Sequence, residues 1–295
     1  MAASASLAVS PLLLSSCNTG LAGKRLTILH TNDMHSQIDP FDEGKYKGLG
    51  GMAARSSAIK KIRSEEANVL LLDVGDVFQG TPYFNMFGGE LELKLMSEMG
   101  YDATTIGNHE FDNGLDGLKR AMQFANFPYL CANYDFSQNT LAGTTQPFKV
   151  FDKGGVKVGV FGLGIKLAGL VNETMYRNTR YNDPIAVAKE MVQELKTQEC
   201  DLIICLSHMG YQYKWEDRPS DKILAQEVSE IDLILGGHTH TFMEKPLLLT
   251  NDQGFTTTIN QVGWAGINLG RIDIGFTAKG KSAQAYAPIT LSNVV

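Results

Sequence analysis

Five short polar motifs constrain this chain more than any other feature, because they hold five of its six histidines. In chain order the motifs are Thr31-Asn-Asp-Met-His35, Gly75-Asp76, Gly107-Asn-His-Glu-Phe-Asp112, Ser207-His-Met-Gly210 and Gly236-Gly-His-Thr-His240. Imidazoles gathered beside carboxylates and amides are typical of metal sites. Any one histidine taken alone could be a packed core residue, but five of them in such company are hard to explain by packing. The sequence therefore indicates a metalloenzyme.

Two of the motifs place possible ligands two residues apart, Asp33 with His35 and His238 with His240. Side chains two residues apart at the end of a strand leave the same face of the sheet. Each pair is therefore expected to point into one cleft, beyond the carboxyl end of a strand, where open α/β sheets bind ligands. Mixed Asp, Asn and His ligation suits zinc, manganese, iron or cobalt, and not calcium.

Apolar segments alternate with segments of helical spacing along the chain. The pattern predicts strands at residues 26–30, 68–73, 103–106, 129–133, 148–151, 156–162, 201–207 and 231–235. It predicts helices at residues 52–63, 91–99, 115–125 and 185–195, and β-type structure without a helix in the last sixty residues. Continuous apolar strands separated by helices favour an α/β core with strands buried on both faces. One domain is the simpler interpretation.

The charge balance bears on the class of ligand. The formal net charge is −6 and no run of Lys or Arg is present, so nucleic-acid binding is not expected. An anionic substrate would be repelled by such a chain unless bound cations reversed the charge locally. A site with two metal ions would do this.

The first residues differ from the rest of the chain. Residues 7–14 are apolar but too short to span a bilayer, and they lead into Leu14-Ser-Ser-Cys17. This resembles the signal segment and lipobox of bacterial lipoproteins, although no Lys or Arg precedes the apolar stretch. We expect residues 1–24 to be a signal segment with a short tether, lipidated at Cys17 in the bacterial periplasm or cell envelope; a frayed terminus is the alternative. The other cysteines are expected to be reduced thiols: Cys131, Cys200 and Cys205.

The five motifs resemble the pattern of the calcineurin-like metallophosphoesterase superfamily: Asp-x-His, Gly-Asp, Gly-Asn-His-Glu/Asp, a lone His and Gly-His-x-His. The wider stretches at residues 29–35, 75–82 and 100–112 look like the bacterial 5′-nucleotidase branch. The resemblance covers about residues 25–275. It implies a four-layer α/β/β/α sandwich, with residues 25–295 as the catalytic domain and two divalent metal ions at the strand ends.

The resemblance also implies a role for each polar residue of the motifs. It implies that one ion is bound by Asp33, His35 and His240, the other by Asn108, His208 and His238, and both by the bridging Asp76. A hydroxide bridging the two ions would attack the phosphorus atom. His109 and Asp112 match the catalytic dyad of the family, in which the histidine stabilises the phosphoryl oxygens or protonates the leaving group. For Asp112 the alternative is a solvated carboxylate before a helix.

The function expected from these motifs is phosphoester hydrolysis with two metal ions, of the 5′-nucleotidase type. Cyclic-nucleotide or nucleotide-sugar phosphodiesterase, pyrophosphatase and thiosulfohydrolase-like activities are alternatives. In the 5′-nucleotidase branch a nucleotide-binding domain follows the catalytic domain, and this sequence ends at Val295. A catalytic subunit that needs a separate nucleotide-binding protein is therefore another alternative. A surface lipoprotein that only binds a ligand is a remote one.

Two groups of aromatic residues near the motifs could form a wall against which a nucleotide base stacks. They are Tyr83, Phe84 and Phe87 in one segment, and Tyr211, Tyr213 and Trp215 in the other. For the first group the alternative is an apolar loop that packs on the core or against a partner. His30 lies inside the first predicted strand, where packing is its expected role.

Overall fold

The computed structural model describes residues 19–214, 218–277 and 280–292. Its strands are β1 (Arg25–Thr31), β2 (Val69–Asp73), β3 (Tyr134–Asp135), β4 (Phe148–Asp152), β5 (Lys157–Leu163), β6 (Arg180–Tyr181), β7 (Leu202–Ser207), β8 (Leu233–Gly236), β9 (Leu247–Thr250), β10 (Thr256–Asn260), β11 (Asn268–Thr277) and β12 (Gly280–Thr290). Its α-helices are α1 (Met52–Glu65), α2 (Pro82–Phe87), α3 (Glu90–Met99), α4 (Gly114–Met122), α5 (Glu173–Tyr176), α6 (Pro184–Thr197) and α7 (Asp221–Glu227). Short 3₁₀ turns occur at Thr19–Leu21, Gly44–Tyr46 and His109–Phe111.

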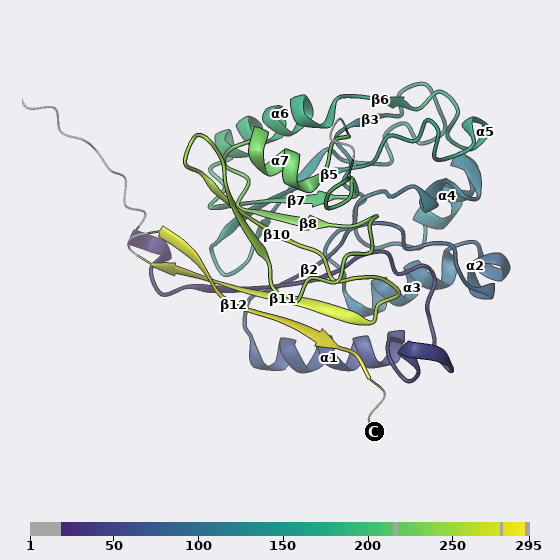
Figure 1. The fold of residues 1–295 in the computed structure, drawn as a ribbon, viewed down its shortest axis with the longest axis horizontal. Helices are drawn as coiled ribbons and strands as arrows, with labels where there is room; N and C mark the ends of the chain where they lie inside the picture. Colours follow the sequence, from purple (N-terminus) through teal and green to yellow (C-terminus); the bar gives the residue numbers. More distant parts are fainter. Residues whose placement is uncertain (1–18, 215–217, 278–279, 293–295) are drawn as a thin grey trace, which may run out of the picture.

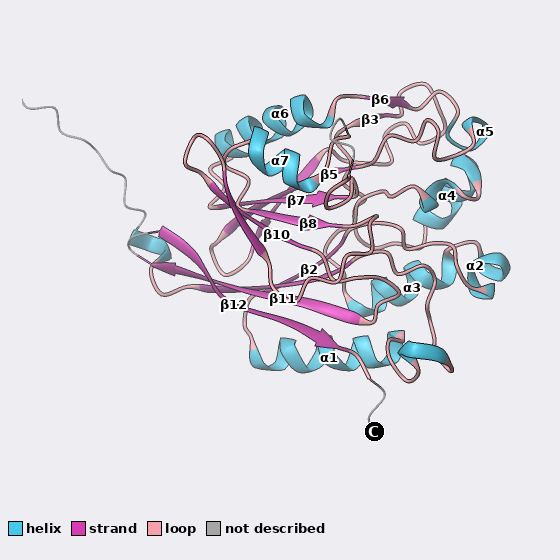
Figure 2. Cartoon of the chain, viewed as in Figure 1, coloured by secondary structure: helices cyan, strands magenta, loops and turns pink. Residues whose placement is uncertain are grey.

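Two β-sheets stack on each other, and helices cover the outer face of each (Figures 1 and 2). One sheet has the strand order β12-β11-β1-β2, and the other has the order β4-β5-β7-β8-β10-β9. Strands β1 and β2 are parallel, and so are β5, β7, β8 and β10. Loops that follow parallel neighbours leave the same edge of a sheet, so the loops after these strands can supply one common site.

The apolar side chains separate into three cores that define four layers. The middle core lies between the sheets and takes alternate residues of both, such as Ile28 of β1 and Ile204 of β7. The opposite face of β1 contributes Leu29 to a core beneath α1 and α3. The opposite face of β7 contributes Ile203 to a core beneath α6 and α7. Because β1 and β7 are buried on both faces, apolar residues point to both sides of each strand, and the predicted α/β/β/α sandwich is confirmed.

Two segments that were predicted to be strands do not form regular strands. They link the two sheets instead. In residues 103–106, Ala103 pairs with Leu72 at an isolated bridge, and Thr104 pairs with Tyr129 at another. In residues 129–133, the amide of Ala132 donates to the carbonyl of Gly162, which belongs to the other sheet. Each segment is extended and apolar, as the sequence suggested. Neither continues a ladder, because the chain passes from one sheet towards the other at this point.

The other strand and helix predictions hold, with shifted ends at several positions. The helices not predicted are the short ones, α2, α5 and α7. Pro82 at the start of α2 was an available signal, since proline favours the first turn of a helix. The cysteines at 131, 200 and 205 carry free thiols, as expected. In the described part of the chain no helix is long and apolar enough to cross a membrane.

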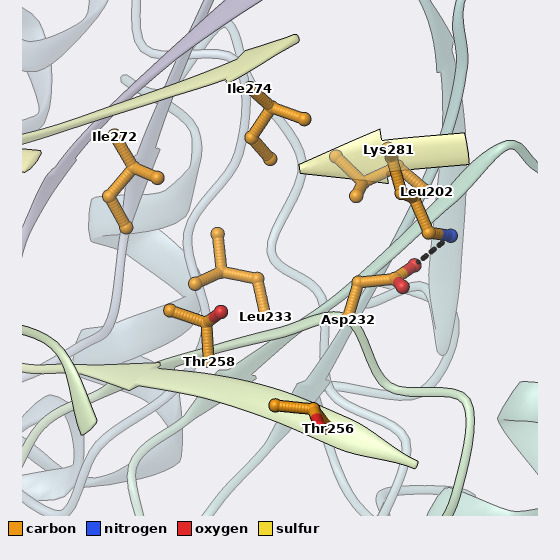
Figure 3. Close-up of a pocket in the computed structure, with 8 residues that line it drawn as sticks. All are labelled: Leu202, Asp232, Leu233, Thr256, Thr258, Ile272, Ile274 and Lys281. Atoms are coloured by element: carbon orange, nitrogen blue, oxygen red, sulfur yellow. Dashed lines mark hydrogen bonds and ion pairs between the residues drawn. The ribbon is translucent and has the colours of Figure 1, made fainter. Parts of the chain in front are cut away.

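A small cavity of about 100 Å³ lies between the sheets, lined by one residue each of β7 and β8 and by alternate residues of β10 and β11 (Figure 3). Leu233 and Ile272 belong to its apolar wall, and an ion pair between Asp232 and Lys281 (2.6 Å) lies at one side. Asp232 and Lys281 lie near the amino ends of β8 and β12. Four of the five motifs lie at the carboxyl ends of strands, and no motif residue lines this cavity, so the cavity is separate from them.

Candidate metal centre

The nine residues predicted for the site lie close together, and six of them stand in loops that follow strands. Asp33 and His35 follow β1, Asp76 follows β2, His208 follows β7, and His238 and His240 follow β8. Asn108, His109 and Asp112 lie in and around the 3₁₀ turn that precedes α4. The structure therefore brings together side chains that are up to 207 residues apart in sequence (Asp33 and His240).

Five of the nine residues have left-handed backbone conformations. Their φ angles are 51° for Asp33, 46° for His35, 52° for Asp76, 68° for His238 and 52° for His240. Such angles are uncommon outside glycine and cost about 1–3 kcal/mol each, so they persist only where the surroundings hold them. The prediction that each i, i+2 pair uses the two-residue repeat of an extended strand is therefore wrong. The side chains converge because the loops turn.

Asp33, His35 and His240 form the first group of possible ligands. The Nε2 atoms of His35 and His240 are 2.9 Å apart, and His240 Nε2 lies 3.3 Å from Asp33 Oδ1. The Nδ1 atom of His35 lies 3.3 Å from the carbonyl oxygen of Phe78. A carbonyl can only accept, so Nδ1 carries the proton and the lone pair of Nε2 faces the group.

Asp76, His208 and His238 form the second group, with Asn108 beside them. Asp76 Oδ2 lies 3.0 Å from His208 Nε2, and Asn108 Oδ1 lies 2.8 Å from His238 Nδ1. Nδ1 of His208 donates to the carbonyl of Val74 (2.6 Å), which leaves its Nε2 directed at Asp76. Burial would lower the pKa of His208, but the charge of Asp76 raises it to about 10. Asp76 also joins a third group with His35 and His109, so it stands between the two sets.

The residues present fit two divalent cations. The Nε2 atoms of His35 and His240 face each other at 2.9 Å, and with the proton of His35 on Nδ1 both can direct a lone pair at one cation. The fully buried Nε2 of His208 lies 3.0 Å from Asp76 Oδ2 and 4.0 Å from Asp33 Oδ1, so it faces two carboxylates at once. Cations between these atoms would satisfy the unused lone pairs and the Asp33 and Asp76 carboxylates together.

Removing divalent cations is therefore expected to destabilise the protein. A metal bound about a thousandfold above its Kd adds about 4 kcal/mol to the free energy of unfolding, so Tm should fall by roughly 5–10 °C after chelation. Differential scanning calorimetry of dialysed protein, with and without added Mn²⁺ or Zn²⁺, measures this shift. The Asp76→Asn variant is the control, because its Tm should respond much less to the chelator. Equal responses of both proteins would contradict metal binding at this group.

His109 and Asp112 form a pair beside the two groups. Nδ1 of His109 donates to Asp112 Oδ2 at 2.9 Å, and both side chains are about one-third exposed. The backbone amide of His109 donates to Asp76 Oδ1 (2.8 Å), which ties the pair to the centre. Burial lowers the pKa of His109, but the hydrogen bond to Asp112 and the charge of Asp76 raise it more, so it lies above the usual value. His109 is thus suited to donate a proton or a hydrogen bond from Nε2.

The structure adds two residues to which sequence analysis gave no role. Glu110 is buried, and its carboxylate accepts from the amides of Asp76 (3.0 Å), Val77 (2.8 Å) and Gly107 (2.6 Å). Burial raises the pKa of Glu110 to about 7. Asn32 donates to Asp33 Oδ2 (2.7 Å) and to the carbonyl of Gly263 (2.5 Å). Both residues lie inside the motifs, and this position was the signal from which a role for them could have been predicted.

Close packing explains glycine at two motif positions. A Cβ at Gly107 would overlap Asp76 Oδ1 and would lie 2.8 Å from His208 Cε1. Gly75 has a φ of 80°, and a Cβ there would meet the amide of Gly107 at 2.6 Å. The loops after β2 and before α4 can therefore approach each other only with glycine at both positions.

The two aromatic groups proposed as base-stacking walls are largely used elsewhere. Phe84 is buried and stacks on Phe78 (5.4 Å between centroids), so for this ring core packing is the correct interpretation. Tyr213 donates its hydroxyl to the carbonyl of Met209 (2.6 Å). Phe87 is exposed. Trp215 and the predicted lipidation site Cys17 lie outside the described residues.

His30 is fully buried, and its Nε2 lies 2.7 Å from Asn260 Nδ2. Its side chain belongs to the packed interior and to none of the groups of possible ligands found in the described residues. The predicted packing role of this histidine is confirmed.

Comparison with known proteins shows to which family the chain belongs. The chain is 36% identical to a 5′-nucleotidase of Vibrio parahaemolyticus and 34% identical to the 5′-nucleotidase of Rattus norvegicus, over 92% of this chain in both cases. It spans about half the length of these curated relatives, 52% and 50%. Its fold superposes on the crystal structure of a 5′-nucleotidase precursor from Thermus thermophilus with a TM-score of 0.83 and 30% identity, covering 91% of this chain and 55% of that one. The model of the calcineurin-like phosphoesterase family matches residues 26–242. The chain belongs to the calcineurin-like phosphoesterase family, as its motifs predicted.

Proposed function

We propose that this chain hydrolyses phosphoesters with the help of two divalent metal ions and that its substrates are 5′-nucleotides. The observation that carries the proposal is the convergence of seven possible ligands and the His109–Asp112 pair at one edge of the sheets, in a member of this family. The similarity to proteins named 5′-nucleotidase supports the choice of substrate.

The ligand sets follow the grouping of the side chains. One ion would be held by Asp33, His35 and His240, the other by Asn108, His208 and His238, and both by Asp76. Zinc, manganese, iron or cobalt would suit these nitrogen and oxygen donors. Two such ions, when bound, clamp a phosphoryl group, offset its negative charge and lower the pKa of a coordinated water. Positive charge at this place also matters because the chain has a net charge of −6.

His109 would supply the proton or hydrogen bond that the reaction needs. Asp112 holds its Nδ1–H, which fixes the tautomer and leaves Nε2 for the substrate. With its pKa raised, the imidazolium would donate from Nε2 to a phosphoryl oxygen or to the departing ester oxygen. Asp112 acts through His109, by orienting the ring and favouring its charged form.

We also infer how the chain is organised around this domain. Residues 25–295 would form the catalytic domain, and residues 1–24 would act as a signal segment and tether. A secreted or envelope location accords with that segment and with nucleotides as small-molecule substrates. Lipidation at Cys17 is part of this proposal, and mass spectrometry of the membrane-extracted protein would test it.

Phosphate release from a panel of phosphoesters tests the proposed function. The panel contains 5′-nucleotides, cyclic nucleotides, nucleotide-sugars and bis(p-nitrophenyl) phosphate, each assayed with added manganese, zinc or cobalt. We expect 5′-nucleotides to be hydrolysed with the highest kcat/KM and the activity to disappear on chelation. The Asp76→Asn variant, purified in parallel, controls for contaminating phosphatases.

The pattern across the panel separates the alternatives. Hydrolysis of the generic diester alone would contradict the choice of substrate and would indicate that base recognition is supplied by another polypeptide or segment. Higher activity on cyclic nucleotides or nucleotide-sugars would show that the protein is a diesterase or pyrophosphatase and not a monoesterase. No hydrolysis of any compound by metal-loaded protein would overturn the proposal.

A further inference from the structure

A buried glutamine, Gln261, lies against the loop that carries two of the candidate metal ligands. It follows directly after β10, and its side chain is fully buried. The side-chain amide makes its hydrogen bonds with the loop after β8, which holds His238 and His240. Sequence analysis gave this glutamine no role, because it stands outside all five motifs. Only the tertiary structure brings it to the candidate metal centre.

The amide of Gln261 contacts alternate residues of that loop. Its Nε2 donates to the carbonyl of Gly237 (2.6 Å), and its Oε1 accepts from the hydroxyl of Thr239 (3.1 Å) and from the backbone amide of Thr241. A carbonyl can only accept and a backbone amide can only donate, so these partners fix which end of the side-chain amide is the oxygen. The three contacted residues alternate with the two histidines of the loop. Gln261 therefore holds the chain on both sides of each histidine.

The backbone that Gln261 holds in this way is strained. His238 and His240 have φ angles of 68° and 52°, in the left-handed region that residues other than glycine rarely adopt. Such conformations persist only where the surroundings impose them. In this conformation the two imidazoles enter different groups of possible ligands, that of His238 with Asp76 and that of His240 with Asp33. An extended loop would direct both side chains to the same face, so the strain is what separates them.

The contacts of Gln261 continue into the neighbouring loops. The hydroxyl of Thr239 accepts from the backbone amide of Tyr211 (3.0 Å), in the loop after β7. The amide of Val262, the next residue after Gln261, donates to Oδ1 of Asn32 (3.0 Å) in the loop after β1. Residues 261 and 262 thus stand at the centre of one hydrogen-bond network that joins the loops after β1, β7 and β8, each of which carries candidate ligands.

We propose that Gln261 is a positioning residue, which sets the directions of His238 and His240 so that each faces a different metal ion. This inference rests on the proposed function, because it uses the two ligand sets given there. Gln261 acts through the backbone of the loop and not by contact with an ion or a substrate. Residues that only orient metal ligands typically contribute about 10- to 100-fold to metal affinity. Because one histidine belongs to each ligand set, the loss of Gln261 should weaken the binding of both ions.

Metal binding to the Gln261→Leu variant tests the proposal. Leucine keeps much of the volume of the side chain and removes both of its polar ends. Isothermal titration of metal-free protein with Mn²⁺ measures the Kd of each binding step. We expect both Kd values to rise about 10- to 100-fold in Gln261→Leu. Differential scanning calorimetry of the metal-free protein records the loss of stability separately, since a merely structural role would lower Tm and leave the Kd values unchanged.

A matched control is available at the other end of β10. Asn251 is buried in the turn between β9 and β10, and its side-chain amide also accepts two hydrogen bonds and donates one. Its Oδ1 accepts from the backbone amides of Gln253 and Phe255 (both 3.0 Å), and its Nδ2 donates to the hydroxyl of Ser229 (2.8 Å). Asn251→Leu removes the same kinds of contact. It should lower the Tm of the metal-free protein and leave both Kd values at the wild-type level.

A second variant serves if Gln261→Leu folds poorly. Thr239→Val keeps the shape of the side chain and removes the hydroxyl that bonds Gln261 and the amide of Tyr211. Two of the three hydrogen bonds of Gln261 remain in this variant. Thr239→Val should therefore raise both Kd values for Mn²⁺ by a smaller factor than Gln261→Leu.

Metal affinity and turnover together separate this inference from the proposed function. If the wild-type protein binds metal and hydrolyses AMP but Gln261→Leu and Thr239→Val keep the wild-type Kd values, the inference is overturned and the proposed function stands. Equal increases in Gln261→Leu and Asn251→Leu would also overturn it, because the cause would then be a general loss of stability. If the wild-type protein binds metal and hydrolyses no phosphoester, while Gln261→Leu alone weakens binding, the proposed function fails and the positioning role stands.

Discussion

Replacing Asp76 with asparagine is expected to lower kcat by at least about 10³-fold. The carboxylate belongs to two of the three groups of possible ligands, and it is the residue proposed to contact both ions. Asparagine has nearly the same shape but carries no charge, so it offers one neutral oxygen where two anionic oxygens stood. A loss of several kcal/mol in stabilising the transition state corresponds to this factor.

Steady-state kinetics with AMP or bis(p-nitrophenyl) phosphate, together with metal content by mass spectrometry, measure the effect of Asp76→Asn. The matched control is Asp116→Asn on α4, which removes a carboxylate of the same kind from an exposed position. Asp116→Asn should retain the wild-type rate and metal content. If Asp76→Asn also retained the wild-type rate, the assignment of a shared ligand to this position would be wrong.

Replacing His109 with asparagine or alanine is expected to lower kcat by about 10²- to 10⁴-fold, the usual contribution of a positioned acid or base. His109 stands apart from the candidate ligands in one respect. Its Nδ1 donates to a carboxylate, that of Asp112, whereas Nδ1 of His35 and Nδ1 of His208 each face a backbone carbonyl. Its ring lies edge-on to that of His35 at 5.2 Å. Both metal ions should therefore remain bound when His109 is replaced.

Metal content measured beside kcat decides between catalysis and ligation at His109. A fall in metal content in step with activity would show that His109 is a ligand and that the proposed division of roles is wrong. Asp112→Asn is the companion variant. It should lower kcat less than the loss of His109, because it disturbs the tautomer and charge of the imidazole without removing it.

Family, fold class and the main elements were predictable because the signals are local. The apolar sequences of β2 and β7 reflect burial on both faces, so both segments were recognisable as central strands. The segments at residues 103–106 and 129–133 carry the same apolar signal, yet each makes isolated bridges in place of a ladder. Local composition reports burial, but it does not report whether a segment continues one sheet or crosses to the next.

The sequence pointed to nine candidate residues that the structure brings close together, but it did not predict the way they converge. The two-residue spacing of His238 and His240 suggested one common direction on a strand. In the structure both residues have left-handed backbones and fall into different groups, His240 with Asp33 and His238 with Asp76. Such conformations are enforced by contacts between loops, as when the amide of His35 donates to the carbonyl of Asp76 (3.0 Å). A sequence does not display those contacts.

The sequence by itself determined which elements form and which side chains are available for chemistry, since apolar periodicity and the motif residues are properties of short segments. The tertiary structure alone decided how the loops meet. It placed Glu110 under three amides, directed Nε2 of His208 at Asp76, and placed the ring of Trp264 beside that of His240. These contacts join residues far apart in the chain, and their geometry depends on the packing of two sheets against each other.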